Sequence, residues 1–327
     1  MPILDKGLYL DPKYDYFNKY VNVAYKGFWT PAKYEQDIEE IDVPHFNNLL
    51  SETSKETIRR CILAVSMVED KVKTYWPTIS FDIPHTIISD AGGLMGQMEV
   101  THRRSYHALA KGLKVDMEDT KKHSVLQGRI KYLTKYLEKD PKVIGKKRVL
   151  KRLVLFTSLV EKCSLFTQFY ILMSFAKRKQ SLKAISDLQR STAIEENVHY
   201  SFGLDIINII KDEYPQLWSN YLVEAVEKNI EAAYRSERNL IDWFFEKGVP
   251  SHLSKDEVKN FLKYNFYTVN KDLELGLNFN YDETMLKEKS LWFVEATKAP
   301  VNPDFFDGNV GGYSSEKKET NINTFKF

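Results

Sequence analysis

Two copies of one short pattern, Glu99-Val100-Thr101-His102 and Glu196-Asn197-Val198-His199, lie far apart in the chain, each within a long stretch of helical periodicity. Residues three apart on an α-helix share one face, so each pair can direct a carboxylate and an imidazole to the same point. Four-helix bundles that bind two metal ions use two such pairs, together with one Glu from each of two further helices. The repeated pattern therefore favours a helical bundle around a dinuclear metal site.

Helical periodicity extends over most of the chain. Apolar residues recur at intervals of three and four, and Pro77, Pro215 and Gly248-Val249-Pro250 follow such stretches and mark their ends. No long segment alternates apolar and polar residues as a half-buried strand does. The predicted fold is all-α, with helices over residues 54–76, 84–112, 118–138, 147–177, 181–213, 215–247 and 254–275.

Three local signals refine these helices. Gly92, Gly93 and Gly96 interrupt the early half of helix 84–112, which indicates close packing or a distortion just before the first Glu-x-x-His pair. Ser254, followed three residues later by Glu257, is typical of a capped helix start. The stretch 147–177 is apolar on nearly all sides, so we expect it to be central.

Four Glu and two His in the central helices are candidate metal ligands. Two of the Glu begin the repeated pairs, and the other two, Glu69 and Glu161, lie mid-helix on or beside apolar stripes. Four carboxylates in a dry core would be very costly without compensating cations. A single Glu-x-x-His on a helix is more often a solvated face, but two copies with two further buried Glu favour metal binding. The candidate ligands are Glu69, Glu99, His102, Glu161, Glu196 and His199.

The composition limits the kinds of binding partner and the cellular compartment that we expect for this chain. The 327-residue chain has 47 basic and 45 acidic residues, a formal net charge of +2, and the two signs are interspersed. The chain therefore has no broad region of positive electrostatic potential that would attract nucleic acid or an anionic membrane. The most apolar segment, residues 153–176, contains charged residues and is disfavoured as a membrane span. Cys61 and Cys163 exclude a disulfide framework. With no N-terminal signal-peptide run, we expect a cytoplasmic protein.

The chain divides into three parts. Residues 1–50 show little periodicity, which predicts an irregular N-terminal arm with one short helix. Residues 51–299 form the predicted helical domain. Residues 300–327 are rich in Gly, Asn, Ser, Lys and Glu. Such a segment buries too little apolar surface to fold alone, so we expect a flexible C-terminal tail.

The segment from Glu99 to Tyr106, Glu-Val-Thr-His-Arg-Arg-Ser-Tyr, resembles the Glu-x-x-His-x-x-x-Tyr segment of the radical-generating small subunit of class I ribonucleotide reductase. The resemblance covers most of the chain, from Trp29 to the tail. It implies a ferritin-like bundle with extra helices and a stable radical on Tyr106. This residue lies two helical turns after Glu99, on almost the same face. An ordinary core tyrosine is the alternative reading of Tyr106.

The resemblance also implies which metals are bound. Glu69 matches the first ligand, where many members of the family have Asp, and Asp70 is the adjacent alternative. Oxygen and nitrogen ligands suit iron or manganese. We expect two iron ions, with two manganese ions or one of each as alternatives. If manganese is used, a flavoprotein activator is a possible partner.

In the family, the oxidising equivalent passes through the protein to the large subunit, where ribonucleotides are reduced to deoxyribonucleotides. Trp29 resembles the relay tryptophan near the metals. Glu195 occupies the position of an Asp that links a metal-bound His to that tryptophan by hydrogen bonds. Tyr313 resembles the tyrosine that bridges the subunits, and the terminus around Phe325 and Phe327 resembles the peptide that docks on the large subunit. The resemblance implies a homodimer.

Two other readings share the helical architecture. One is a dinuclear oxidase that acts on its own bound ligand and does not need the tail. The other is a ferritin-like iron store, which would assemble into a hollow shell and would not require Trp29, Tyr106 and Tyr313 together.

Overall fold

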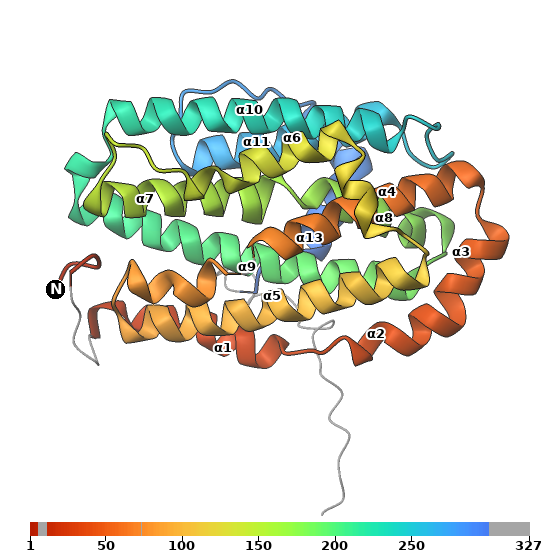
Figure 1. Ribbon diagram of the computed structural model, residues 1–327, viewed down its shortest axis with the longest axis horizontal. Coiled ribbons are helices and arrows are strands. Elements are labelled where there is room, and N and C mark those ends of the chain that lie inside the picture. The colour runs from red at the N-terminus through yellow and green to blue at the C-terminus, as the bar shows by residue number, and fades with distance from the viewer. Residues whose placement is uncertain (6–11, 73, 301–327) are drawn as a thin grey trace, which may run out of the picture.

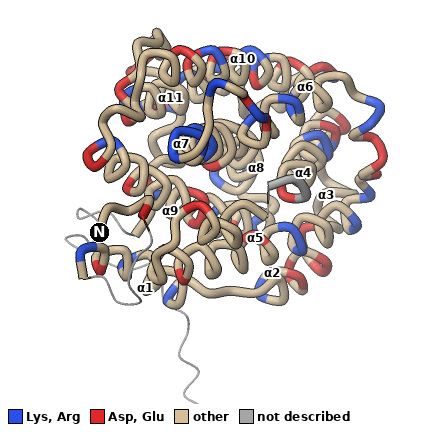
Figure 2. Tube along the Cα trace, turned by 60° about the vertical axis from the view of Figure 1, so that its left-hand side comes forward, with Lys and Arg blue, Asp and Glu red and all other residues tan. Residues whose placement is uncertain are grey.

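The computed structural model describes residues 1–5, 12–72 and 74–300, apart from the side chains of residues 70–72. Tyr313, Phe325 and Phe327 lie outside the described residues. Within these ranges the regular structure is entirely helical, which confirms the all-α prediction. None of the described helices is long and apolar enough to cross a membrane. Figure 2 shows Lys and Arg mixed with Asp and Glu over the outer helices, with a run of basic residues on α7 (Gly145–Leu155).

Four antiparallel segments run side by side along the long axis and form the centre of the molecule (Figure 1). They are α4 (Glu52–Val72), α5 (Thr86–Gly112), α9 (Lys183–Glu213), and α7 continued by the π-helical segment η6 (Phe156–Cys163). After a bend, α8 (Phe166–Lys179) packs on both α9 and α4. The four segments carry the six candidate ligands.

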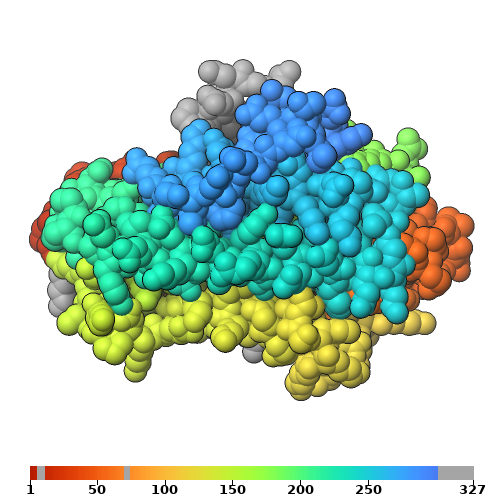
Figure 3. Space-filling view, turned by 90° about the horizontal axis from the view of Figure 1, so that it is seen from above, coloured from red at the N-terminus to blue at the C-terminus, as the bar shows by residue number. Residues whose placement is uncertain are grey.

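Further helices cover one long face of this centre (Figure 3). They are α6 (Ser124–Leu133), α10 (Asn220–Phe244), α11 (Lys255–Asp272), α12 (Glu283–Met285), the π-helical η8 (Leu286–Ser290) and α13 (Leu291–Ala296). Ser254 caps α11 by accepting a hydrogen bond from the backbone N–H of Glu257 at 3.1 Å, as its spacing predicted. Short 3-10 turns lie at Met117–Lys121, Thr134–Leu137 and Pro215–Leu217.

The expectation of an irregular N-terminal arm is wrong for residues 12–49. This segment forms a 3-10 turn η1 (Pro12–Phe17), α1 (Asn18–Gly27), α2 (Ala32–Asp37), the π-helical η2 (Ile38–Asp42) and α3 (Val43–Leu49). Isolated aromatic residues anchor these short helices on the core. Tyr20 donates a hydrogen bond to Asp205 at 2.7 Å, and the hydroxyls of Tyr34 and Ser191 lie 2.6 Å apart. Tertiary contacts therefore stabilise helices too short for periodicity to reveal.

Several predicted helices are interrupted or end early in the structure. The stretch 147–177 is interrupted, because the chain widens into η6 and bends before α8. The stretch 118–138 splits into α6 and two 3-10 turns, and the Gln127 side-chain amide donates to the Thr120 carbonyl at 2.9 Å across the first break. Helix 54–76 ends at Val72, and Trp76 begins the 3-10 turn η3 (Trp76–Phe81).

The glycines before Glu99 allow η3 to pack directly on α5. A Cβ added at Gly92 would lie 2.6 Å from Ile79 Cγ2, and one at Gly96 would overlap the ring of Pro77. The same addition at Gly93 meets no neighbour within 4 Å. The predicted close packing is thus confirmed at two of the three glycines, and it fixes where Trp76 lies.

We expect Gly96→Ala to destabilise the fold by about 1–3 kcal/mol, because the proline ring cannot yield to the added methyl group. Gly93→Ala, on the same helix but facing open space, is the matched control and should stabilise it by about 0.5–1 kcal/mol. Urea unfolding followed by circular dichroism measures both. Equal effects of the two substitutions would contradict this packing.

Candidate metal centre

The six candidate ligands converge in two overlapping groups of buried side chains. Within each group, one ligand atom per residue lies within 4.8 Å of every other. Glu99 and Glu196 belong to both groups, whereas each group has its own Glu and its own His. This is the arrangement that two neighbouring cations with two shared carboxylates require. The groups are Glu69, Glu99, His102 and Glu196, and Glu99, Glu161, Glu196 and His199.

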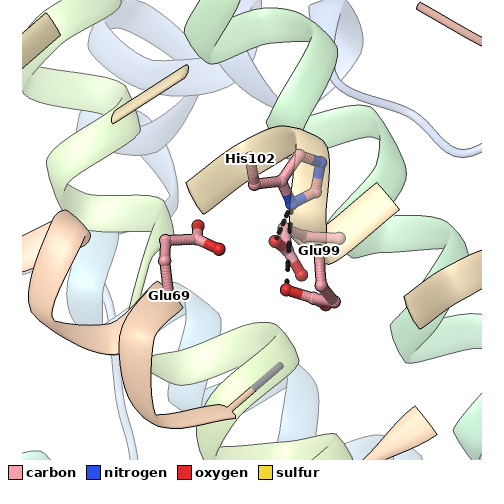
Figure 4. A group of neighbouring side chains, drawn as sticks. Glu69, Glu99 and His102 are labelled. Atoms are coloured by element: carbon pink, nitrogen blue, oxygen red, sulfur yellow. Dashed lines mark ion pairs between the residues drawn. The ribbon is translucent and has the colours of Figure 1, made fainter. Parts of the chain in front are cut away.

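Both imidazoles turn Nδ1 toward the carboxylates. His102 Nδ1 lies 3.2 Å from Glu196 Oε1 and 4.0 Å from Glu99 Oε2. His199 Nδ1 lies 3.1 Å from Glu99 Oε1 and 3.4 Å from Glu161 Oε2. Figure 4 shows the Glu69 carboxylate entering from α4, across from Glu99 and His102 on α5. Side chains from separate helices therefore face one small space.

The centre concentrates charge in a dry interior. Burial raises the pKa of Glu69 and of Glu161 well above the ordinary value for Glu. Burial by itself would lower the pKa of His102 and His199, but the surrounding carboxylates raise both. The cluster thus retains protons in the absence of other cations, and a bound metal ion would displace them.

The unpaired atoms of this cluster fit metal ions. Several ligand atoms find no hydrogen-bond partner among the described residues: both oxygens of Glu69, one oxygen each of Glu99, Glu161 and Glu196, and Nδ1 of both histidines. Buried polar atoms are rarely left without partners in folded proteins. Carboxylate oxygens with imidazole nitrogens form a donor set that iron and manganese accept. The residues present therefore fit a dinuclear centre.

Neighbouring side chains hold several ligands in place from outside. Glu195 Oε2 lies 2.6 Å from His102 Nε2, and the Trp76 indole N–H donates to Glu161 Oε1 at 2.7 Å. Such outer contacts set which ligand atom faces a metal. The sequence did not indicate the role of Trp76, since it fell on the apolar stripe of a predicted helix. Its position directly before Pro77 was the only local signal that it could leave that helix.

We expect Trp76→Phe to weaken metal binding at the Glu161 side about 10–100-fold, as loss of an orienting contact typically does. The ring still fills the space, but Glu161 Oε1 loses its donor. Tyr75→Phe is the control, because it removes a hydroxyl group from the neighbouring residue and leaves the hydrogen bond from Trp76 to Glu161 intact. Competitive titration with a chelator measures the affinity, and indistinguishable results for the two variants would exclude an orienting role for Trp76.

Trp29 lies between α1 and α2, with its ring stacked near His102 at a centroid separation of 6.1 Å and an interplanar angle of 27°. The hydrogen-bonded link from Trp29 through Glu195 to a histidine is formed only in part. Glu195 contacts His102, but the Trp29 indole nitrogen has no hydrogen-bond partner among the described residues. Tyr34 packs edge-on against the indole at 5.4 Å. Ring contact, rather than a continuous hydrogen-bond chain, joins Trp29 to the centre.

Tyr106 is fully buried on α5, one turn after His102. Its hydroxyl donates to Gln189 Oε1 on α9 at 2.7 Å. Burial, with the nearby charge of Glu69, raises the pKa of Tyr106 well above the usual value for a phenol. The side chain therefore stays protonated in the buried core. Gln189 was not predicted, because nothing in the sequence marks an amide as the partner of a residue on another helix.

The family model for the small chain of ribonucleotide reductase matches residues 8–285. The chain belongs to this family. It is 25% identical over 172 residues to the ribonucleoside-diphosphate reductase subunit beta of Chlamydia pneumoniae, which covers 52% of this chain and 47% of the relative. The chain thus aligns with about half the length of that curated relative. The resemblance noted in the sequence is confirmed at the level of the family.

Solved structures of other proteins have the same fold as this chain. The R2 subunit of ribonucleotide reductase from Clostridium botulinum superposes with a TM-score of 0.75 at 16% identity, covering 87% of this chain and 89% of the other. An R2-like ligand-binding oxidase with a Mn/Fe cofactor gives a TM-score of 0.63 at 15% identity, covering 83% and 96%. At such identities the similarity establishes the fold and leaves the reaction to be inferred from the site.

Proposed function

We propose that this chain is the radical-generating small subunit of a ribonucleotide reductase, working with a large subunit that reduces ribonucleotides to deoxyribonucleotides. The observation that carries the proposal is the pair of overlapping ligand groups with a buried tyrosine on the same helix. Glu99 and Glu196 are shared by both groups, and Tyr106 is buried on α5, seven residues after Glu99. Family membership supports this reading.

A pair of iron or manganese ions would supply oxidising power from oxygen when bound. Glu69 and His102 would hold one ion, Glu161 and His199 would hold the other, and Glu99 and Glu196 would contact both. All six side chains are buried, so the protein excludes water from the space between them. Glu195 fixes the ring of His102, and Trp76 fixes the carboxylate of Glu161.

Tyr106 is the proposed radical site. Gln189 holds its O–H in one orientation, and the surrounding core keeps solvent away from the ring. From there the oxidising equivalent would pass outward by way of the His102 region, where Glu195 and Trp29 lie. Tyr313 and the aromatic terminus, both outside the described residues, would complete the path and dock the large subunit. We also propose a homodimer in the cytoplasm.

Deletion of residues 308–327 tests the partner. With a large subunit from the same source, the full-length chain should form deoxynucleotides, and the truncated chain should lose this activity while keeping its metals and its radical. Product formation is measured by chromatography, and the centre by elemental analysis and electron paramagnetic resonance. Unchanged nucleotide reduction by the truncated chain would refute docking through the tail.

The second candidate is an oxidase that acts on a bound ligand, and the fold similarity to the R2-like oxidase favours it. It predicts oxygen consumption without any large subunit and no effect of the deletion of residues 308–327.

Elemental analysis of protein from its native source distinguishes iron from manganese. Mass measurement in solution distinguishes the proposed dimer from the many-subunit shell of an iron store.

A further inference from the structure

A cavity of about 300 Å³ lies on the outer side of the metal centre, between η6, α9, α11 and α13. It far exceeds the ~10–15 Å³ that a single water requires. Two of its lining residues, Lys162 and Asn197, directly follow the proposed ligands Glu161 and Glu196 in the chain. Neither side chain takes part in the cluster described above, so the cavity is a separate space behind the ligand helices.

Lys162 brings a positive charge into this cavity, although burial lowers the pKa of its ammonium group to about 8 and the charge of Asp272 offsets this only in part. Its Nζ donates to Asn197 Oδ1 at 2.8 Å and lies 4.5 Å from the ring centroid of Phe166 and 5.4 Å from that of Tyr200. Asp272, which lines the same cavity, acts on this ammonium group by its charge and not through a hydrogen bond. Aromatic faces stabilise a cation only in part. The ammonium group therefore retains N–H donors for an acceptor in the cavity.

Asn265 on α11 adds a second unused donor. The residue is only 1% exposed, it lines the same cavity, and its Nδ2 has no hydrogen-bond partner in the described part of the chain. A buried amide N–H₂ without a partner is costly unless something in the cavity accepts from it. Two donor groups, one charged and one neutral, thus line one space.

The balance of charge around the cavity favours an anion over a cation. Lys162 and Lys298 line it, against one carboxylate, Asp272. The Tyr200 hydroxyl already donates to Asp272 Oδ2 at 2.9 Å, so one of its oxygens is occupied. The remaining walls include three further aromatic rings, Phe261, Tyr264 and Phe293. These rings offer apolar faces to the body of a ligand.

We propose that this cavity binds a small organic carboxylate with a flat apolar body, its carboxylate held between Lys162 and Asn265 and its body against the aromatic walls. The inference uses neither the metals nor the proposed radical chemistry, so it stands or falls separately from the proposed function. An occupant would contact Lys162 and Asn197, each next to a metal ligand in sequence.

Benzoate is the probe, compared with neutral benzamide and cationic benzylamine, which have the same ring. Calorimetric titration of the metal-loaded full chain should show one benzoate per chain, bound about tenfold or more tightly than benzamide, since a charge-assisted hydrogen bond is lost in the amide. Tighter binding of benzylamine than of benzoate, or no benzoate binding at millimolar concentration, would overturn the proposal.

Substitutions of the lining residues test where the carboxylate of benzoate binds. Lys162→Met should weaken benzoate binding about tenfold or more, and Lys177→Met, an exposed lysine outside the cavity, should leave it unchanged. Asn265→Asp keeps the shape of the side chain but adds a negative charge, so this variant should bind benzylamine more tightly than benzoate. It tests the proposed carboxylate site even if Lys162→Met does not fold. Asp272→Asn should strengthen benzoate binding by removing a like charge. Unchanged affinity in both Lys162→Met and Asn265→Asp would contradict the assigned site.

Discussion

Glu196→Gln is expected to abolish binding of both metal ions, whereas Glu69→Gln should remove only one. Glu196 contributes an oxygen to each of the two ligand groups, while Glu69 belongs to one. Gln keeps the size of the side chain but loses the negative charge that draws and holds a divalent cation. Elemental analysis after loading with iron or manganese should therefore give no ions per chain in the first variant and one in the second.

Glu99→Gln and Glu161→Gln form the matched second pair. Glu99 belongs to both ligand groups, so Glu99→Gln should lose both ions. Glu161 belongs to one group, so Glu161→Gln should lose one ion. The metal-free fold should survive all four changes, because Gln has nearly the size and shape of Glu and fills the same buried space. Circular dichroism and thermal unfolding check this. A loss of both ions in every variant would show that the two positions fill only together, and no loss in Glu196→Gln would refute its shared role.

Tyr106→Phe should eliminate the tyrosyl radical and reduce nucleotide reduction to the level of the metal-free protein. Phe keeps the ring in the same buried pocket but has no O–H to lose, so it cannot form a phenoxyl radical. Metal content should be unchanged, since no oxygen of Tyr106 belongs to either ligand group. Electron paramagnetic resonance after exposure of the metal-loaded protein to oxygen measures the radical directly.

Tyr20→Phe is the control for this experiment. It also removes one hydroxyl from a buried tyrosine, but that hydroxyl donates to Asp205 rather than lying near the centre. The radical signal should persist in Tyr20→Phe and disappear in Tyr106→Phe. A tyrosyl signal of full intensity in Tyr106→Phe would place the radical on another residue and remove the main support for the proposed function.

Helical periodicity and residue spacing predicted the larger features of this molecule. The i, i+3 spacing of Glu99 with His102 and of Glu196 with His199 is a local property of a helix, so it could be derived before any tertiary contact was known. The apolar stripes beside Glu69 and Glu161 likewise indicated that these carboxylates face the core. The short helices of residues 12–49 escaped prediction because contacts with α5 and α9, rather than their own periodicity, stabilise them.

The sequence by itself determined that the chain folds into helices and that the two Glu-x-x-His pairs face inward, because both follow from spacing along one helix. Only the tertiary structure decided that Glu99 and Glu196 are the shared carboxylates, that Trp76 donates to Glu161, and that Trp29 contacts His102 through its ring. These relations depend on the rotation and depth of one helix against another. Side-chain packing across the whole core sets both, and no short stretch of sequence contains them.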